Sequence, residues 1–168
     1  MGFREIEAAS LSDNPFTLIG TAWMLITAGT PTRFNTMTAS WGGLGVLWER
    51  NVCTVYIRPT RYTHEFVEQA ETFTVSFFGE QYRKALLFCG THSGRDTNKM
   101  KETGLTPRSR DGYIWFDEAR LVLLCRKIYS QDIRPERFID PGLEKLYPQK
   151  DYHRMYVGDI AVCLSKEE

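Results

Sequence analysis

Apolar and polar residues alternate along the clearest segment of the chain, which is the pattern of a half-buried β-strand. In "FTVSF", Phe73, Val75 and Phe77 occupy every second position, with Thr74 and Ser76 between them. Other runs rich in β-branched and aromatic residues predict strands over residues 16–29, 34–43, 51–59, 72–79, 119–133 and 155–165. Turn signals separate these runs at Gly29, Gly42–Gly43, Pro59, Gly79 and Asp111–Gly112.

Two stretches have apolar residues at helical spacing instead. These residues are Phe66, Val67 and Ala70 within residues 61–71, and Tyr82, Ala85, Leu86 and Phe88 or Cys89 within residues 80–90. Gly90 is the expected C-cap of the second helix, and the proline-containing residues 130–154 predict an extended loop. The pattern therefore predicts a mainly β protein with a few short helices, whose antiparallel sheet closes, or nearly closes, into a barrel.

Length and charge narrow the class of protein. The chain has 168 residues, which suits a single domain over residues 1–168 with one hydrophobic core. Lys plus Arg equal Asp plus Glu at 21 each, and no nucleic-acid-binding motif is present, so we expect neither nucleic acid nor a membrane as a partner. Charged residues interrupt the N-terminal segment, and no apolar run approaches the ~20 residues of a membrane span. We therefore expect a cytoplasmic protein.

The cysteine and histidine residues do not form a recognisable metal or disulfide pattern. No Cys-x-x-Cys pair occurs among Cys53, Cys89, Cys125 and Cys163. Three of the four lie in expected strands, where burial as small hydrophobic side chains is favoured over a disulfide framework. No shared helical spacing relates His64, His92 and His153, so no metal site is expected.

The segment "RFNTMTASWGG", residues 33–43, concentrates small polar side chains beside an indole. Its amide and hydroxyl groups come from Asn35, Thr36, Thr38 and Ser40. In a strand, the last three would share one face, while Met37 is the one aliphatic side chain that could anchor the run in a core. Neutral polar groups on one face suit a polar, planar ligand. The alternative is a solvent-facing threonine ladder on an edge strand.

The segment "IRPTRYTHE", residues 57–65, joins an expected strand to an expected helix. Two guanidinium groups, two hydroxyls and the first N–H groups of the helix fall within about one turn, at Arg58, Thr60, Arg61 and Thr63. This combination is how proteins build an anion site, and a phosphate would fit it. The alternative is ordinary helix capping by Thr60 or Thr63, with two solvated arginines.

The segment "GTHSGRDTNK", residues 90–99, offers a third set of polar groups. Gly90 and Gly94 allow tight turns, and Lys99 adds a positive charge, so the segment could complete a phosphate or ring contact. A hydrolase triad is disfavoured here, because no nucleophile elbow is present and its members would be the nearly adjacent Ser93, His92 and Asp96.

In their order and spacing, these segments resemble the flavin reductase and flavoredoxin-like family of FMN-binding split-barrel proteins. The resemblance rests on "NTMTASWGGLGVLWERNVCTVYIRPTRYTHEFVEQAETFTVSFF", on "SGRDTNKMKETGLTP" and on the closing "YVGDIAVC". It covers most of residues 10–165. It implies an antiparallel split β-barrel that binds FMN, or in some members FAD, non-covalently at a homodimer interface.

The resemblance also implies which residues bind the flavin. Beside the isoalloxazine ring it places Asn35, Thr36, Met37, Thr38 and Ser40. At the phosphate it places Arg58, Arg61, Tyr62 and Thr63, with further contacts from Ser93, Gly94 and Lys99. Trp41 would pack near the ring, or would be a core tryptophan with its N–H satisfied. Outside these motifs, His153 would approach the ring or the nicotinamide donor, or would be a local hydrogen-bonding residue at a loop-to-strand junction.

The activity that the resemblance implies is hydride transfer from NADH or NADPH to flavin, and then to free flavin or an electron acceptor. A flavin carries its own redox chemistry, so no acid–base dyad is required and no catalytic residue is assigned. The sequence "GGLG" lacks the form of a dinucleotide-binding fingerprint. Two alternatives stay open: an FMN-dependent electron carrier that does not oxidise nicotinamides, and a cofactor-free interaction domain on the same barrel.

Overall fold

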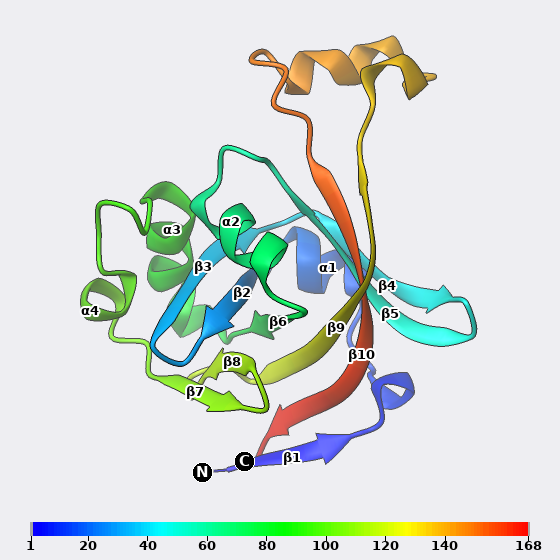
Figure 1. Ribbon diagram of the computed structural model, residues 1–168. Coiled ribbons are helices and arrows are strands. Elements are labelled where there is room, and N and C mark those ends of the chain that lie inside the picture. Colours follow the sequence, from blue (N-terminus) through cyan, green and yellow to red (C-terminus); the bar gives the residue numbers. More distant parts are fainter. Residues whose placement is uncertain (1, 168) are drawn as a thin grey trace.

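One large antiparallel sheet dominates the computed structural model, which describes residues 2–167 (Figure 1). The strands are β1 (Phe3–Ile6), β2 (Met24–Thr30), β3 (Arg33–Ala39), β4 (Gly42–Leu47), β5 (Arg50–Ile57), β6 (Thr72–Phe77), β7 (Pro107–Arg110), β8 (Tyr113–Phe116), β9 (Leu121–Asp132) and β10 (Arg154–Lys166). The helices are α1 (Pro15–Gly20), α2 (Tyr62–Gln69), α3 (Arg83–Thr91) and α4 (Lys99–Thr103). Short 3₁₀ helices are η1 (Ala8–Ser10), η2 (Glu80–Tyr82), η3 (Pro135–Arg137) and η4 (Pro141–Leu146).

The strand order makes the sheet an antiparallel split β-barrel. The order is β3-β2-β6-β9-β10-β5-β4, with β1 paired to β10, while β7 and β8 form a separate hairpin. The two end strands, β3 and β4, follow one another in sequence, yet in the described residues they do not pair, and they separate at Ser40 and Trp41. The predicted fold class, mainly β with a few short helices, is confirmed.

Alternating side chains build a hydrophobic cluster on each face of the sheet. The first cluster takes Phe73, Val75 and Phe77 from β6, and α2 packs against it. The predicted alternation of faces is confirmed, but β6 is not half-buried, because Thr74 and Ser76 on its other face are buried as well. The second cluster takes Leu25 from β2 and alternate residues of β9, and α3 covers it with Leu86 and Cys89. The edge strand β3 therefore lies between α2 on one face and α3 on the other.

Residues 133–153, here called the arm, connect the ends of β9 and β10 and project away from the body of the sheet (Figure 1). The sequence predicts an extended loop over residues 130–154, and this is only partly right. Asp132 still pairs with Arg154 in the sheet and also accepts two hydrogen bonds from its guanidinium, at 2.6 and 3.0 Å. The arm itself contains η3 and η4.

The strand predicted over residues 16–29 is wrong in its first part. Residues Pro15–Gly20 form α1, because Pro15 stands at the start of the helix and the Asn14 side chain accepts a hydrogen bond from the backbone N–H of Phe16, at 2.9 Å. The strand begins only at Met24. Local capping therefore outweighs the β propensity of "FTLI".

Other predicted boundaries also change. The turn expected at Gly42–Gly43 is instead the start of β4, which pairs with β5, and a Cβ on Gly42 would lie 2.9 Å from the carbonyl oxygen of Thr54. Gly90 lies inside α3, whose C-cap is His92. The turn at Asp111–Gly112 is confirmed, with positive φ angles of 50° and 83°, and it joins β7 to β8, two strands that the sequence pattern missed together with β1.

The four cysteines are buried, as predicted, and each is a free thiol. Burial raises the pKa of the Cys89 thiol, and likewise that of Cys163, to about 11, which keeps both protonated near neutral pH. Across residues 2–167, no helix has the length and apolar character needed to cross a membrane.

Candidate functional site

Three adjoining pockets line the outer edge of β3, where no further strand covers it within residues 2–167. The Trp41 pocket has a volume of about 190 Å³ and is lined by Met37, Thr38, Ala39, Ser40, Trp41, Tyr56, Arg58, Arg61 and His153. The Arg61 pocket, of about 270 Å³, is lined by Asn35, Thr60, Arg61, Tyr62, Thr63, Gly90, Thr91, His92, Ser93, Gly94, Arg95 and Lys99.

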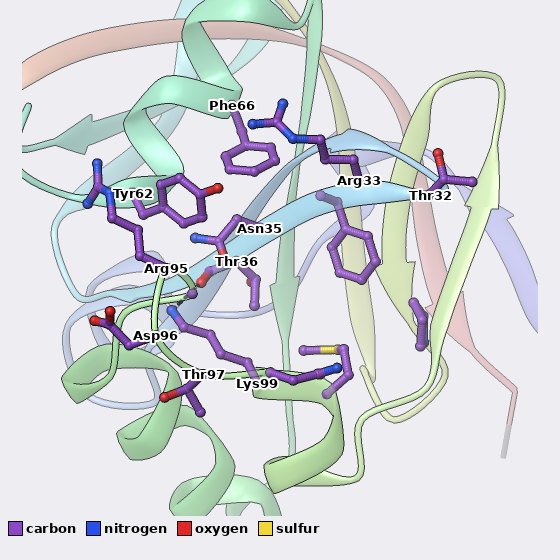
Figure 2. Close-up of a pocket in the computed structure, with 15 residues that line it drawn as sticks. Thr32, Arg33, Asn35, Thr36, Tyr62, Phe66, Arg95, Asp96, Thr97 and Lys99 are labelled. Carbon is purple, nitrogen blue, oxygen red and sulfur yellow. Dashed lines mark hydrogen bonds between the residues drawn. The ribbon is translucent and has the colours of Figure 1, made fainter.

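The Arg33 pocket is the largest of the three, at about 580 Å³ (Figure 2). It is lined by Thr32, Arg33, Phe34, Asn35, Thr36, Tyr62, Phe66, Gly94, Arg95, Asp96, Thr97, Asn98, Lys99, Met100 and Pro107. The Arg61 pocket shares Arg61 with the Trp41 pocket, and it shares Tyr62 and Lys99 with the Arg33 pocket. The three pockets therefore form one cleft along β3.

The structure brings all of the predicted site residues to this cleft. The Trp41 pocket collects Met37, Thr38, Ser40, Trp41, Arg58 and Arg61. The other two pockets collect Asn35, Thr36, Tyr62, Thr63, Ser93, Gly94 and Lys99. The segments 33–43, 57–65 and 90–99, which are separate in the sequence, therefore meet at one edge of the sheet.

The hydroxyl groups of the first segment have a different role from the predicted one. The Thr36 hydroxyl donates a hydrogen bond to the Ile26 carbonyl at 3.2 Å. It also lies 2.8 Å from the Thr27 hydroxyl, and either of these two hydroxyls can be the donor between them. The Thr38 hydroxyl donates to the Leu86 carbonyl in α3. These bonds hold β3 to β2 and α3, so the solvent-facing threonine ladder is wrong, and the two hydroxyl protons are already donated within the protein.

Asn35 connects β3 to α2 on the opposite face. Its side-chain amide donates to the Thr63 hydroxyl at 2.9 Å, in buried surroundings. The 90–99 segment approaches the same side chain so closely that a Cβ on Gly94 would lie 2.1 Å from the Asn35 amide oxygen. Glycine is therefore required at position 94 by close approach, which explains its place in this segment.

The two arginines of the second segment differ in their partners. Arg58 donates to the Asp151 carboxylate at 2.8 Å and to the Leu146 carbonyl at 2.9 Å, and its guanidinium lies 4.7 Å from the Tyr147 ring centroid. These contacts bind the arm to the end of β5. Arg61 forms no ion pair and no side-chain hydrogen bond with the described residues, although burial lowers the pKa of its guanidinium.

The N-terminus of α2 is left without a side-chain cap. Its N-cap residue is Arg61, and the Thr63 hydroxyl is already accepting from Asn35, so the predicted capping by Thr60 or Thr63 is wrong. In the described part of the chain, the backbone N–H groups of Tyr62 and Thr63 have no acceptor. Uncapped N–H groups, with the positive end of the helix dipole, favour an anion at this point.

Lys99 brings a second cation to the same pocket. Its side chain is buried, and its ammonium donates to the carbonyls of Thr36 and Cys89 at 2.7 and 2.9 Å. An ammonium group has three donors, so one stays available. Burial, reinforced by the charge of Arg61 and opposed by Cys89, lowers the pKa of Lys99 to about 8. No carboxylate within residues 2–167 pairs with Lys99.

The other end of the cleft is aromatic. Trp41 is 44% exposed, so the interpretation as a core tryptophan is wrong, and its ring centroid lies 5.1 Å from that of His153. The His153 Nδ1 lies 2.8 Å from the Tyr147 hydroxyl, which is the predicted local hydrogen bond, while its ring also lines the Trp41 pocket. Burial and the charge of Arg58 lower the pKa of His153 to about 4, so the ring is neutral at pH 7.

His92 and Ser93, two members of the disfavoured hydrolase triad, contact residues that are near them in the sequence. The His92 ring stacks on Phe88 at 3.9 Å, and its Nδ1 contacts the Thr91 hydroxyl. The Ser93 hydroxyl accepts a hydrogen bond from the Arg95 backbone. No three His, Cys, Asp or Glu side chains of residues 2–167 gather in a way that could hold a metal ion.

Sequence reasoning missed Arg33, Arg95 and Tyr56 as lining residues of the cleft. Arg33 begins the segment 33–43 and Arg95 lies within the segment 90–99, so both could have been included as candidates from their positions in these two polar segments. Tyr56 lies beside Trp41 because β4 pairs with β5, with Gly42 opposite Val55. A turn was expected at Gly42–Gly43 instead, so this pairing was not predicted.

Solved structures share this fold. An FMN-binding domain of a flavin reductases-like enzyme from Shewanella baltica aligns over 98% of this chain and 77% of its own, with 18% identity and a TM-score of 0.70. A flavoredoxin from Methanosarcina acetivorans aligns over 87% and 69%, with 20% identity and a TM-score of 0.69. An NADH:FAD oxidoreductase from Streptomyces globisporus aligns over 87% and 76%, with 15% identity and a TM-score of 0.66.

Comparison of the sequence with protein families gives a more direct assignment. No curated protein sequence matches the chain. The family described as "Flavin reductase like domain" matches residues 16–161, which include all three segments of the cleft. This match covers most of the chain, and the split barrel agrees with it. The chain therefore belongs to the flavin reductase-like domain family.

Proposed function

We propose that the cleft binds a flavin nucleotide, FMN in the simplest case, and that the protein is an NAD(P)H-dependent flavin oxidoreductase. The observation that carries the proposal is the pair of cations, Arg61 and Lys99, that have no carboxylate partner among the described residues and lie beside an uncapped helix N-terminus. Two cations, two free N–H groups and a close-fitting glycine are a donor set that suits a phosphate dianion. The residues present therefore fit the phosphate of a flavin nucleotide.

The Trp41 pocket suits the ring end of the same ligand. It is lined by the indole of Trp41, the neutral imidazole of His153 and the hydroxyl-bearing Ser40, at the point where β3 and β4 separate. Aromatic faces and neutral polar groups are typical of sites for planar ligands. The exposed backbone edge of β3 adds N–H and C=O groups that can bond the polar rim of a ring.

When bound, a flavin supplies the hydride-accepting and hydride-donating chemistry. The residues of this chain bind and orient it. Arg61 and Lys99 fix the phosphate, and the hydrogen bonds of Thr36 and Thr38 keep β3 rigid beside the ring. Rigid positioning of this kind lowers the entropic cost of bringing two reacting groups together. His153, neutral at pH 7, adds no positive charge of its own to the ring end.

The second candidate function is an FMN-dependent electron carrier that does not oxidise nicotinamides. Its support is that the similar structures include flavoredoxins, from Methanosarcina acetivorans and Desulfovibrio vulgaris, as well as flavin reductases. The two functions share the flavin and differ in the electron donor. Steady-state oxidation of NADH and NADPH with added flavin separates them, because an electron carrier gives no rate above the flavin-only control.

The first experiment is flavin binding by the purified protein. Visible absorbance is recorded after FMN is added and the excess removed, in parallel for the wild type and Arg61→Gln. Retained flavin bands in the wild type, reduced in the variant, support the proposal. A protein that stays colourless at high FMN concentration contradicts it, and would favour a cofactor-free interaction domain instead.

A homodimer and a cytoplasmic location are part of the proposal. Apolar side chains lie exposed on both sides of the cleft, with Phe16 at 85% and Trp41 at 44% exposure near the Trp41 pocket, and Ile139 fully exposed on the arm. Exposed apolar groups in this number are typical of interaction surfaces. Light scattering coupled to size-exclusion chromatography tests the dimer. A monomer at micromolar concentration would contradict it.

A further inference from the structure

Lys127 stands in β9 at a position where the alternation of the strand calls for an apolar side chain. Leu121, Leu123 and Cys125, at every second position of β9, belong to the first hydrophobic cluster, against which α2 packs. Lys127 is the next residue in this series, so its side chain leaves β9 on the face that α2 covers. Its backbone N–H donates to the carbonyl of Glu71, two residues after α2 ends, at 2.8 Å. A positive charge therefore lies at the C-terminal end of α2.

The Lys127 ammonium binds the last turn of α2. It donates to the carbonyls of Val67 and Glu68 at 2.6 and 3.2 Å. These carbonyls are among the last four of the helix, which the helix itself leaves without donors, and residues 66–69 include no basic side chain of their own. Lys127 therefore supplies both the donors and the positive charge that stabilise this end of the helix dipole.

Glu68 attaches the same turn to β10. Its carboxylate accepts a hydrogen bond from the Tyr156 hydroxyl at 2.5 Å and pairs with the Arg154 guanidinium at 3.1 Å. Tyr156 is fully buried in the first hydrophobic cluster, so its hydroxyl is a fixed anchor for the carboxylate. We call Lys127, Glu68, Tyr156 and Arg154 the α2 clamp, because together they hold the last turn of α2 to β9 and β10.

The first turn of the same helix borders the Arg61 pocket. The backbone N–H groups of Tyr62 and Thr63 have no acceptor among the described residues, and Arg61 precedes them as the N-cap. With 8 residues, α2 is only about two turns long, and it is shorter than the ~12–15 residues that an isolated helix needs in water. Its position therefore depends on contacts with the rest of the protein, and a shift of its last turn also shifts its first.

We propose that Lys127 and Glu68 are positioning residues for a phosphate bound at the N-terminus of α2. The α2 clamp fixes the last turn, and the short helix then holds its first N–H groups at the geometry that an anion needs. Neither side chain is part of the described lining of the cleft, so both act through the helix and not by contact with a ligand. This inference rests on the proposed flavin site and deepens it, because it names residues outside the cleft that set its phosphate affinity.

The test compares equilibrium binding of FMN and riboflavin by fluorescence titration in the wild type and in Lys127→Met. We expect this variant to lose about three- to tenfold in FMN affinity and less than about twofold in riboflavin affinity, because only FMN carries the phosphate. Lys127→Arg keeps the charge and the donors, and should retain most of the FMN affinity. The matched control is Lys84→Met, at an exposed lysine of α3, which should change neither affinity.

Glu68→Gln tests the other half of the α2 clamp. It removes the ion pair to Arg154 and keeps an oxygen that can accept from the Tyr156 hydroxyl, so it should lower FMN affinity by only about two- to threefold. Without flavin, hydrogen–deuterium exchange should be faster than in the wild type at residues 62–69 in both variants, and unchanged in the core strands.

The outcomes separate the inference from the proposed function. Unchanged FMN affinity in Lys127→Met would overturn the inference and leave the flavin site intact, whatever the exchange rates. Equal losses for FMN and riboflavin would also overturn it, because they would reflect a general loss of structure. A wild type that binds neither flavin would overturn the proposed function, and the inference with it. Thermal unfolding of each variant verifies that the protein is folded at the temperature of the titration.

Discussion

Arg58 and Arg61 stand three positions apart between β5 and α2, and they differ in the number of partners that their guanidinium groups have in the structure. Arg58 is fully engaged, with a carboxylate, a carbonyl and an aromatic ring of the arm around its guanidinium. Arg61 faces two pockets with no acidic partner among residues 2–167. A buried cation without a partner is costly, so it is kept where a ligand supplies the missing charge. The comparison teaches that pairing, and not residue type, marks the ligand site.

The largest expected effect is on FMN affinity, which should distinguish the two arginines. Arg61→Gln should weaken FMN binding by about 10- to 100-fold, because one charge-assisted contact to a phosphate is lost, at roughly 1.5–3 kcal/mol. Arg58→Gln should change FMN affinity by less than about threefold, because its guanidinium is already occupied. Parallel fluorescence titrations measure both. Equal losses in the two variants would show that both arginines bind the phosphate and that the arm contacts are incidental.

The second prediction compares the free energies of unfolding of the same two variants. Arg58→Gln removes the ion pair to Asp151 and the bond to the Leu146 carbonyl, and should lower the free energy of unfolding by about 1–2 kcal/mol. Arg61→Gln should leave that free energy unchanged or raise it, because an unpaired, partly buried cation is removed. Thermal unfolding without flavin measures both changes. The arm of Arg58→Gln should also be cut faster by a protease at residues 133–153, and an arm as resistant as that of the wild type would contradict its proposed anchoring.

The third prediction concerns Lys99, which lines the Arg61 pocket and, like Arg61, has no ion-pair partner among the described residues. Burial lowers the pKa of Lys99 to about 8, below its usual 10.5, so the ammonium loses its charge as the pH rises through 8. FMN affinity should therefore fall between about pH 7 and 9, by at most about tenfold per pH unit, since the phosphate is already a dianion there. Riboflavin, which has no phosphate, is the control and should show no such fall. An equal fall for riboflavin would assign the titration to another group.

Lys99→Met supplies the matched variant for that titration. It should bind FMN more weakly at pH 7 and show no further loss up to pH 9. Because the carbonyls of Thr36 and Cys89 lose their donor, its stability should also fall. Persistence of the pH dependence in this variant would exclude Lys99 as its source.

Sequence reasoning located the cleft and misjudged how its parts work. The polar run was recognisable because Asn35, Thr36, Thr38 and Ser40 concentrate amide and hydroxyl groups beside an indole, but the acceptors of the two threonine hydroxyls lie in β2 and α3. Their positions depend on the register of β2 against β3 and on the packing of α3, which no local pattern encodes. The sequence therefore identified the strand that lines the cleft and missed the bonds by which the Thr36 and Thr38 hydroxyls hold β3 to β2 and α3.

Trp41 and Arg33 were misinterpreted or missed for the same physical reason, which is that exposure and ion pairing depend on the tertiary fold. Trp41 is exposed because β3 and β4 separate there, and the sequence showed only an indole between polar and glycine residues. Arg33 escaped notice because an arginine at the start of a strand is common, and it is distinguished only by forming no ion pair with the carboxylates of the described residues. Residue identity is local, whereas pairing depends on the whole fold.

The smallest expected effect concerns His153, which lies beside the engaged arginine. The charge of Arg58 adds to burial and lowers the pKa of His153 to about 4, although Asp151 opposes the shift. The unfolded chain protonates this histidine near its usual pKa of 6.5, before the folded protein does, so stability should fall as the pH drops from about 6.5 to 4. Because solvent screens a partly buried group, we expect a total loss of only about 1 kcal/mol over this range. His153→Phe keeps an aromatic ring beside Trp41 and should lose this part of the slope, as measured by thermal unfolding across that range. Because its charge arises at the base of the arm, the same protonation should loosen the arm before the phosphate end changes. A slope identical in His153→Phe and the wild type would place the acid sensitivity elsewhere and would separate the arm from the Trp41 pocket.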